Sequence, residues 1–295
     1  MTCRELYLQA RRVLGGAGVD SPSFDAAALT EHFLGLDRPA LAVRGGETPA
    51  PAAETAFLEA LAQRAARRPL QYILGEWPFL GLCLRVGEGV LVPREDTAVL
   101  VEALAEALAR RPAPRGLDLC AGSGAVGLGL CSLIPGTQVA CVELDPAAMG
   151  YLRENVARYP QYQASAVRAN VLEPPCGFKG GLDFLASNPP YVPSPEVPDL
   201  QPEVLQEPRL AVDGGGDGLV FYRAITDHWL GLVRPGGVAA VEIGETQGPA
   251  VAELFESAGL EEVRVLADLA GLDRVVIGRA GSGNAQAQRE TARLS

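Results

Sequence analysis

Short apolar runs alternate with amphipathic, helix-like segments from Pro93 to about residue 279 of this 295-residue chain. The strand-like runs lie at 117–120, 138–143, 164–168, 182–187 and 238–243, and two more follow before residue 280. The helical patterns between them lie at 100–108, 125–133, 217–233 and 249–258, and another opens at Pro146. Alternation of this kind predicts a mainly parallel sheet of about seven strands with helices on both faces. The predicted fold class is therefore α/β.

The first 75 residues have a helical pattern. Leu6, Ala10 and Leu14 recur at helical spacing, and the segment 52–68 also has an apolar side. Ser21 or Ser23 can cap a helix that begins nearby. These patterns predict a small helical domain over residues 1–75, which either recognises a partner or serves as a structural cap.

Residues 76–92 differ from both neighbours. Apolar residues there are separated by Pro78, Gly81 and Gly87, which predicts two short strands forming a β-hairpin linker. The α/β domain then covers 93–279, and Asp96 can cap its first helix. Residues 280–295 are rich in Gly, Ser, Gln and Arg without periodicity, which predicts a flexible tail.

Composition and charge limit the function. The formal net charge is −11, which disfavours binding along a nucleic-acid backbone because phosphates are neutralised by Lys and Arg. None of the six cysteines is spaced as CxxC, so neither a disulfide framework nor a zinc site is expected, and no bound metal is predicted. Charged residues interrupt the N-terminus, and no apolar run is long enough to span a membrane. We therefore expect a cytoplasmic protein.

A glycine-rich turn follows the first strand of the α/β domain. The segment Asp118-Leu119-Cys120-Ala121-Gly122-Ser123-Gly124 leads into a helix, and Glu143 ends the next strand 19 residues after Gly124. Glycines let the backbone turn sharply and approach a ligand, and a carboxylate at the second strand end can accept hydrogen bonds from ribose hydroxyls. The same residues match G-x-G-x-x-G, so this segment alone fits NAD, S-adenosylmethionine or a ligand-free turn.

The tetrapeptide Asn188-Pro189-Pro190-Tyr191 follows the strand-like run 182–187. Successive prolines supply no N–H, so their carbonyls and the Asn188 side-chain oxygen form a rigid set of acceptors for a conjugated NH2 group. The alternative is a proline-rich turn. Ligands of open α/β sheets bind beyond the carboxyl ends of the strands at the topological switch point, where this strand would lie beside the first. That position favours S-adenosylmethionine over NAD. Asp118 favours it too, because a carboxylate suits a ligand with a cationic amino-acid end better than one with a pyrophosphate.

These motifs resemble the class I S-adenosylmethionine-dependent methyltransferases that act on planar nitrogen. Three further segments narrow the resemblance: 69–75 (PLQYILG), 92–97 (VPREDT) and 207–218 (EPRLAVDGGGDG) are similar to those of the peptide chain release factor glutamine methyltransferases. The match runs from about residue 4 to 279. In two places the chain departs from the family pattern. Cys120-Ala121 stands where Gly-Thr is common, a mild change, and 93–98 reads PREDTA where the family has PRPDTE.

The resemblance implies a Rossmann-like class I methyltransferase sheet and a substrate, the glutamine of the Gly-Gly-Gln loop in bacterial-type class I release factors. It also implies that the helical domain binds the release factor. The resemblance also implies which residues bind the cofactor. They are Asp118, the turn residues Cys120, Ala121, Gly122, Ser123 and Gly124, then Glu143, Val171 beside the adenine, and Asn188. S-adenosylhomocysteine would be the product.

For catalysis we hypothesise that Asn188 Oδ1 and the Pro189 carbonyl accept the two hydrogens of the substrate amide, within the motif Asn188, Pro189, Pro190 and Tyr191. Tyr191 either packs against the flat amide or simply forms a wall of the pocket. Arg94 is either part of a substrate loop or a surface salt bridge. The expected partner is a release factor, with no membrane or nucleic acid, and the expected state is a monomer. The competing functions are a nucleic-acid adenine methyltransferase, a dinucleotide-dependent oxidoreductase and a non-catalytic binding module.

Overall fold

The computed structural model describes residues 1–281, and the tail expected at 280–295 lies almost wholly outside the described residues. By its internal contacts the chain divides into two compact units. One unit comprises Met1–Glu76 together with Gln201–Gln206, and the other comprises Trp77–Leu200 and the residues from Glu207 onward. Sequence patterns gave no sign that a hexapeptide from the middle of the chain would pack with the N-terminal helices.

The N-terminal unit is helical. Its helices are α1 (Cys3–Gly16), α2 (Pro22–Leu34), α3 (Arg38–Arg44), α4 (Pro51–Ala65) and α5 (Leu70–Leu74). Thr2 and Glu5 form a reciprocal capping box at the start of α1. Ser21 occupies the cap position of α2 but makes no side-chain capping bond in the described structure. Leu6, Leu14 and Phe57 are fully buried and form part of the core.

A buried ion-pair network ties Gln201–Gln206 to these helices. Arg64 of α4 donates to Asp25 at 2.6 Å and to Glu203 at 2.8 Å, and Arg67 contacts Glu203 at 2.6 Å. Gln206 Nε2 donates to the Arg67 carbonyl. Burial raises the pKa of Glu203, but hydrogen bonds from both arginines outweigh it and lower that pKa to about 2.

The second unit begins with the expected hairpin, β1 (Glu76–Phe79) and β2 (Leu82–Arg85), in its own two-stranded sheet. A seven-stranded sheet follows in the order β5-β4-β3-β6-β7-β9-β8, and this confirms the predicted mainly parallel α/β fold. Its parallel strands are β3 (Arg115–Leu119), β4 (Gln138–Glu143), β5 (Gln163–Arg168), β6 (Leu182–Ser187) and β7 (Val233–Glu242). Strand β9 (Asp273–Ala280) runs antiparallel to β7, and the edge strand β8 (Leu260–Ala267) pairs antiparallel with β9.

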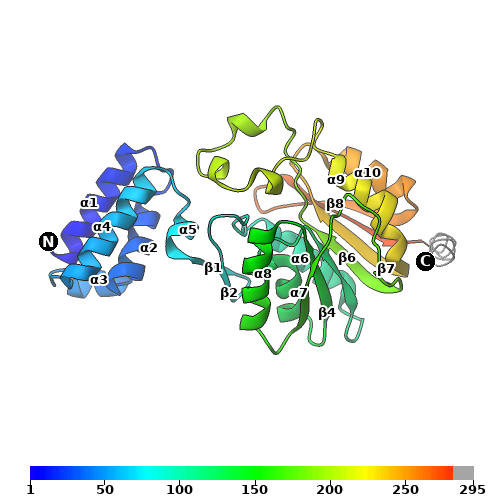
Figure 1. Ribbon diagram of the computed structural model, residues 1–295, viewed down its shortest axis with the longest axis horizontal. Helices are drawn as coiled ribbons and strands as arrows, with labels where there is room; N and C mark the ends of the chain where they lie inside the picture. The colour runs from blue at the N-terminus through cyan, green and yellow to red at the C-terminus, as the bar shows by residue number, and fades with distance from the viewer. Residues whose placement is uncertain (282–295) are drawn as a thin grey trace. The chain divides into compact units, whose positions relative to one another are not determined.

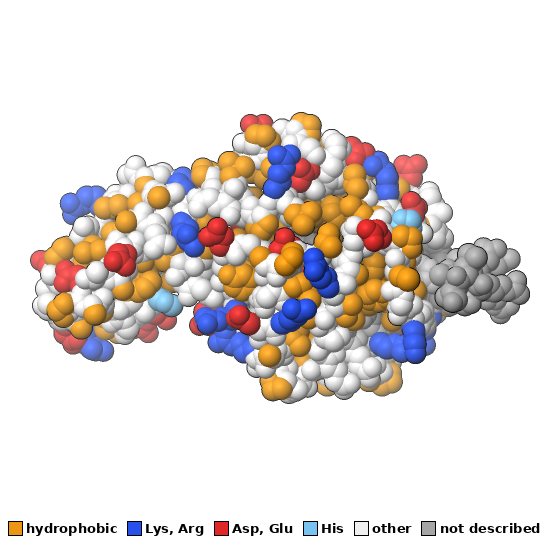
Figure 2. All heavy atoms as spheres, viewed as in Figure 1, with side chains coloured by type: hydrophobic (Ala, Val, Ile, Leu, Met, Phe, Trp, Pro, Cys, Tyr) orange, Lys and Arg blue, Asp and Glu red, His pale blue; other side chains and the backbone are white. Residues whose placement is uncertain are grey.

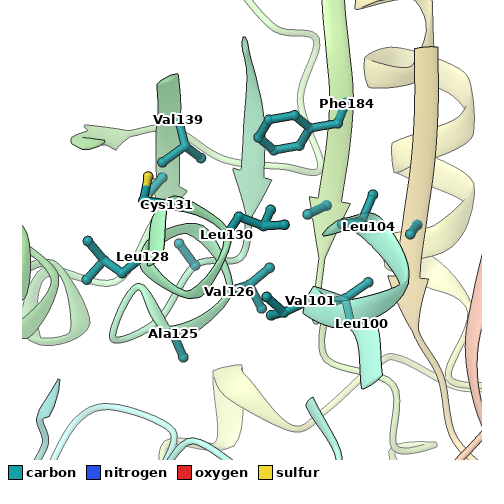
Figure 3. Packing of buried hydrophobic residues seen from close by; sticks show 14 of the residues in the cluster. Leu100, Val101, Leu104, Ala125, Val126, Leu128, Leu130, Cys131, Val139 and Phe184 are labelled. Carbon is teal, nitrogen blue, oxygen red and sulfur yellow. The ribbon is translucent and has the colours of Figure 1, made fainter. Parts of the chain in front are cut away.

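Helices cover both faces of this sheet (Figure 1). On one face lie α6 (Thr97–Leu108), α7 (Ala125–Leu133) and α8 (Pro146–Arg158), and on the other lie α9 (Val220–Ala224) and α10 (Gly248–Ser257). Figure 3 shows the first face, where side chains of α6 and α7 pack toward Phe184 of β6. Asp96 occupies the N-cap position of α6, as expected, but its side chain makes no capping hydrogen bond within residues 1–281. Its carboxylate lies instead 3.7 Å from the guanidinium of Arg274.

The prediction of a single helix at 217–233 is wrong. The structure instead begins α9 at Val220, continues as a π-helical turn over Ile225–Trp229, and ends with a 3₁₀ turn over Leu230–Leu232. A π turn inserts one residue into the helical repeat, which a 3.6-residue pattern does not reveal. Trp229, at the end of this turn, is fully buried and donates its indole N–H to the Val171 carbonyl at 2.8 Å.

Candidate active site

The register of the parallel strands brings the sequence motifs together at one edge of the sheet. Leu119 of β3 pairs with Val142 of β4 on one side and with Ser187 of β6 on the other. The next residues along the chain, Cys120, Glu143 and Asn188, therefore leave the sheet side by side at its carboxyl end. Strand β6 lies beside β3 and reverses the strand order there, so the predicted adjacency at the switch point is confirmed.

The glycine turn between β3 and α7 needs glycine for two separate reasons. Gly122 and Gly124 have φ of +54° and +85°, in the left-handed region that side chains disfavour. Gly127 is needed for space, because a Cβ there would lie 2.6 Å from Cys141 Sγ and 3.1 Å from Asp118 Oδ2. The last glycine of the G-x-G-x-x-G pattern thus lets α7 pack closely on β3 and β4.

Cys120 carries more strain than the sequence suggested. Its φ is +56°, a conformation that costs an L side chain about 1–2 kcal/mol, at the position where the family commonly has glycine. The exchange of glycine for cysteine was expected to be mild because backbone contacts dominate a loop. The left-handed backbone shows instead that this position favours glycine. Burial raises the pKa of the Cys120 thiol well above its usual value, so the thiol is not an activated nucleophile.

Asp118 is a buried acid with unused hydrogen-bonding capacity. Its side chain lies beneath the glycine turn, and the residue is 1% exposed. Oδ2 accepts the Gly127 backbone N–H at 2.9 Å, whereas Oδ1 is buried without a partner among the described residues. Burial raises the pKa of Asp118 to about 7, the Gly127 N–H opposes this, and the nearby Glu143 charge adds to it. A buried acceptor of this kind suits a cationic ligand group.

Glu143 is held by the backbone around it. Its Oε2 accepts the Gly122 N–H at 2.8 Å, and its Oε1 accepts the N–H groups of Leu144 and Asp145 at 2.7 and 2.8 Å. A carboxylate has roughly four acceptor sites, so capacity for a further donor remains. The same contacts make Glu143 a support for the glycine turn, a role that sequence reasoning missed.

The tetrapeptide after β6 is fixed by several neighbours. Asn188 Nδ2 donates to the Thr97 hydroxyl at 3.2 Å. The Tyr191 carbonyl accepts Gln247 Nε2 at 2.9 Å. Gly214 packs so closely behind the motif that a Cβ there would lie 2.7 Å from Tyr191 Cα and 2.8 Å from the Pro190 carbonyl oxygen. The glycine-rich segment 213–218 therefore serves as backbone support for this turn.

A cavity extends from the glycine turn to Asn188. Of the residues predicted for the site, Asp118, Cys120, Ala121, Gly122, Ser123, Glu143, Val171, Asn188 and Pro190 line it. Gly124, Pro189 and Tyr191 are outside this lining. Gly124 instead occupies the N-cap position before α7, where a Cβ would meet Leu152 at 2.7 Å. Burial raises the pKa of Tyr191 to about 12, so its hydroxyl stays neutral at ordinary pH.

The rim of the cavity is largely apolar, and an ion pair between Arg94 and Glu207 lies beside it. Leu144, Leu172 and Leu210 line the cavity and are each more than a third exposed. Arg94, also in the lining, donates to the buried carboxylate of Glu207, which also accepts the Val92 N–H at 3.0 Å. Arg94 thus takes part in an ion pair that anchors the start of the segment 207–211 beside the cavity.

Comparison with known proteins identifies the family. A profile described as "PrmC N-terminal domain" matches residues 5–75, and one described as "Methyltransferase small domain" matches residues 95–222. The release factor glutamine methyltransferase of Moorella thermoacetica is 40% identical over 276 residues, covering 93% of this chain and 97% of that protein. The chain belongs to the release factor glutamine methyltransferase family. The motifs in the sequence predicted this family, and the prediction is confirmed.

Other relatives agree. The release factor glutamine methyltransferase of Deinococcus radiodurans is 37% identical over 283 residues, covering 96% of this chain and 100% of that protein. A solved methyltransferase from Pyrococcus furiosus superposes with a TM-score of 0.50 at 16% identity, covering 79% of this chain and 100% of that one. At this identity the likeness supports the fold alone, which is that of a methyltransferase.

Sequence reasoning missed the residues that support the motifs from behind. Thr97 was recognised only as part of a family segment, and Glu242 and Gln247 received no role. Glu242 did leave a signal, since it is an acid between Val241 and Ile243 in an otherwise apolar strand. An acid in such a run is either paired or functional.

Proposed function

We propose that this protein transfers a methyl group from S-adenosylmethionine to the side-chain nitrogen of the glutamine in the Gly-Gly-Gln loop of peptide chain release factors, and so supports translation termination. The observation that carries the proposal is the position of Asn188. It lies at the carboxyl end of β6, next to the glycine turn, with its amide NH2 bonded to Thr97. Its side-chain oxygen is thereby left to accept from a substrate.

The cavity suits S-adenosylmethionine. Asp118 has a buried, unpartnered oxygen for the ammonium group of the methionine end, and the glycine turn offers backbone at close range. Glu143 has acceptor capacity for ribose hydroxyls, and Val171 forms an apolar wall for the adenine. When bound, S-adenosylmethionine supplies a methyl group already activated by a sulfonium. S-adenosylhomocysteine would be released.

The residues of the chain supply orientation and electrostatics. The nitrogen of a primary amide is a poor nucleophile because its lone pair is delocalised into the carbonyl. An acceptor clamp would take the two amide hydrogens and turn the nitrogen's π face toward the methyl donor. It would be formed by Asn188 Oδ1, in the cavity lining, and by the carbonyl of the next residue, Pro189, which is outside that lining. Alignment of the reacting groups in this way can lower the activation barrier by on the order of several kcal/mol. The clamp dipoles also stabilise the positive charge that develops on nitrogen.

We further propose that the helical residues 1–75 recognise the release factor, that 76–92 serve as the linker, and that 93–279 perform the transfer. The residues proposed to bind the cofactor all lie after position 115, and none of residues 1–75 lines the cavity. Apolar residues at the cavity rim, including the half-exposed Leu210, suit a protein loop better than a charged polymer. On the face drawn in Figure 2, Lys and Arg side chains are scattered among acidic ones and form no continuous basic stripe over the described residues.

Two measurements test the proposal. Calorimetric titration should show binding of S-adenosylmethionine or S-adenosylhomocysteine and none of NAD. Labelled S-adenosylmethionine should then transfer its methyl group to purified release factor but neither to DNA nor to a release factor whose Gly-Gly-Gln glutamine is replaced by alanine. Preferential binding of NAD, or transfer to DNA, would overturn the proposal.

A further inference from the structure

A buried acid lies directly behind the acceptor motif. Ser187 of β6 pairs with Val241 of β7, so the residues that follow them, Asn188 and Glu242, are neighbours at the sheet edge. Glu242 is 1% exposed, and its Oε2 has no hydrogen-bond partner within residues 1–281. Glu242 is outside the lining of the cavity.

The surroundings of Glu242 link it to Asn188 and Thr97. Burial raises the pKa of Glu242 to about 7, and the neighbouring polar side chains of Thr97 and Asn188 lower it. Arg274 of β9 also lowers the pKa, whereas Asp96 at the start of α6 raises it.

Two tyrosines, the partly buried Tyr191 and the fully buried Tyr222, complete these surroundings. The Glu242 charge contributes to the raised pKa of Tyr191 and of Tyr222, whose hydroxyl donates to the Glu242 backbone carbonyl at 2.9 Å. Both tyrosines therefore stay neutral near pH 7, whereas the raised pKa of Glu242 lies in that range.

The Asn188–Thr97 bond and the buried carboxyl beside it bear on which way the Asn188 amide faces. A carboxylate accepts hydrogen bonds and donates none, so an ionised Glu242 attracts the NH2 end of Asn188 and the hydroxyl proton of Thr97. With its proton directed at Glu242, Thr97 Oγ1 can serve Asn188 only as an acceptor, as the 3.2 Å bond from Nδ2 requires. The amide oxygen is then directed away from both residues.

We propose that Glu242 and Thr97 are positioning residues that hold the Asn188 amide with its oxygen toward the substrate. The inference rests on the proposed function, because the oxygen matters only if it accepts from a substrate amide. Reversing the amide would present NH2 to an NH2 group and abolish the clamp. Protonation of Glu242 supplies a donor next to Thr97 and Asn188, which removes the preference for the productive orientation.

The kinetic test uses isosteric variants with release factor as substrate. Thr97→Val removes the hydroxyl at nearly constant volume and should lower the single-turnover rate about tenfold to a hundredfold. This is less than the roughly 10²–10³ for losing a preorganised partner of the reacting group itself, because Thr97 acts through Asn188. Thr97 lines the cavity, but its hydroxyl is not among the groups proposed to bind S-adenosylmethionine, so affinity for the cofactor should fall far less than the rate. Thr97→Ser keeps the hydroxyl and should recover most of the rate. Thr226→Val, whose hydroxyl donates to the Arg223 carbonyl away from the cavity, is the matched control.

A second test needs no activity. The side-chain NH2 signals of Asn188 in a nitrogen-15 spectrum, assigned by their loss in Asn188→Ala, should shift with pH around a midpoint of about 7. Glu242→Gln should remove that titration, slow methyl transfer and flatten the acid side of its pH profile. If Thr97→Val transfers at the wild-type rate, or the Asn188 signals do not respond to Glu242→Gln, the inference is wrong. Absence of transfer by the wild-type protein would instead reject the proposed function.

Discussion

Replacing Gly214 by alanine should misplace the acceptor motif while leaving Asp118, the glycine turn and Glu143 in place. The φ of Gly214 is outside the left-handed region, so the change adds contact but no backbone strain. The new Cβ would lie 2.7 Å from Tyr191 Cα and 2.8 Å from the Pro190 carbonyl oxygen. Ordinary contact begins near 3.4 Å, so the two backbone segments must separate by about 0.7 Å.

The segment has little freedom to retreat. Gly214 N–H donates to the Val192 carbonyl at 2.8 Å, and Val192 N–H donates to the Val212 carbonyl at 2.9 Å. We therefore expect much of the displacement to fall on the tetrapeptide. A misplacement approaching 1 Å costs up to about a hundredfold in rate. Overpacking of this kind lowers the free energy of unfolding by about 1–3 kcal/mol.

The assay is single-turnover methyl transfer with saturating release factor, alongside thermal unfolding and calorimetric titration of S-adenosylmethionine. Gly214→Ala should be at least tenfold slower than the wild type with near-normal cofactor affinity. Gly216→Ala is the matched control, because a Cβ at that nearby glycine meets nothing within 4 Å. If both variants transfer at the same rate, the backbone support assigned to Gly214 is refuted.

Three further changes test the other parts of the site. Glu143→Ala should weaken S-adenosylmethionine affinity by roughly 1–3 kcal/mol in calorimetry, because a charged acceptor is lost; unchanged affinity would remove Glu143 from the site. Asp118 has its pKa raised to about 7, so it becomes anionic as pH rises, and affinity for the cationic cofactor should increase through that range. Asp118→Asn should abolish that increase. Glu203 has its pKa lowered to about 2 from 4.5, so its stabilising effect is present above pH 4.5 and is lost as pH falls toward 2. Unfolding of Glu203→Gln should therefore vary less with pH over that interval, and equal pH dependence would count against the Arg64 and Arg67 pairs.

Much of the fold could be predicted from the sequence because its signals are local. Apolar runs bounded by glycine and proline gave the parallel strands, and the order of motifs gave the switch point beside β3. The association of Gln201–Gln206 with the helical unit escaped prediction, since it depends on arginines that lie far away in the chain. The π-helical turn before Trp229 escaped because one inserted residue leaves the apolar pattern nearly unchanged.

Residues that belong to a ligand-binding motif could be predicted from the sequence. Residues that only support those motifs could not, because their role depends on contacts in the folded protein. Asn188, Glu143 and the glycine turn follow from strand ends and family motifs. The support that Gln247 and Gly214 give to the turn after Asn188 depends on contacts between distant segments. Glu242 is conspicuous in its strand, but only the register of β6 and β7 reveals which side chain it faces.

The most direct test of the account is mass spectrometry of purified release factor after incubation with this protein and S-adenosylmethionine. We predict one methyl group, located by fragmentation on the side-chain amide of the Gly-Gly-Gln glutamine. Asn188→Ala should produce it at least about a hundredfold more slowly while still binding cofactor. A methyl group on another residue, or a near-normal rate for Asn188→Ala, would contradict the account and leave the tetrapeptide as a structural turn.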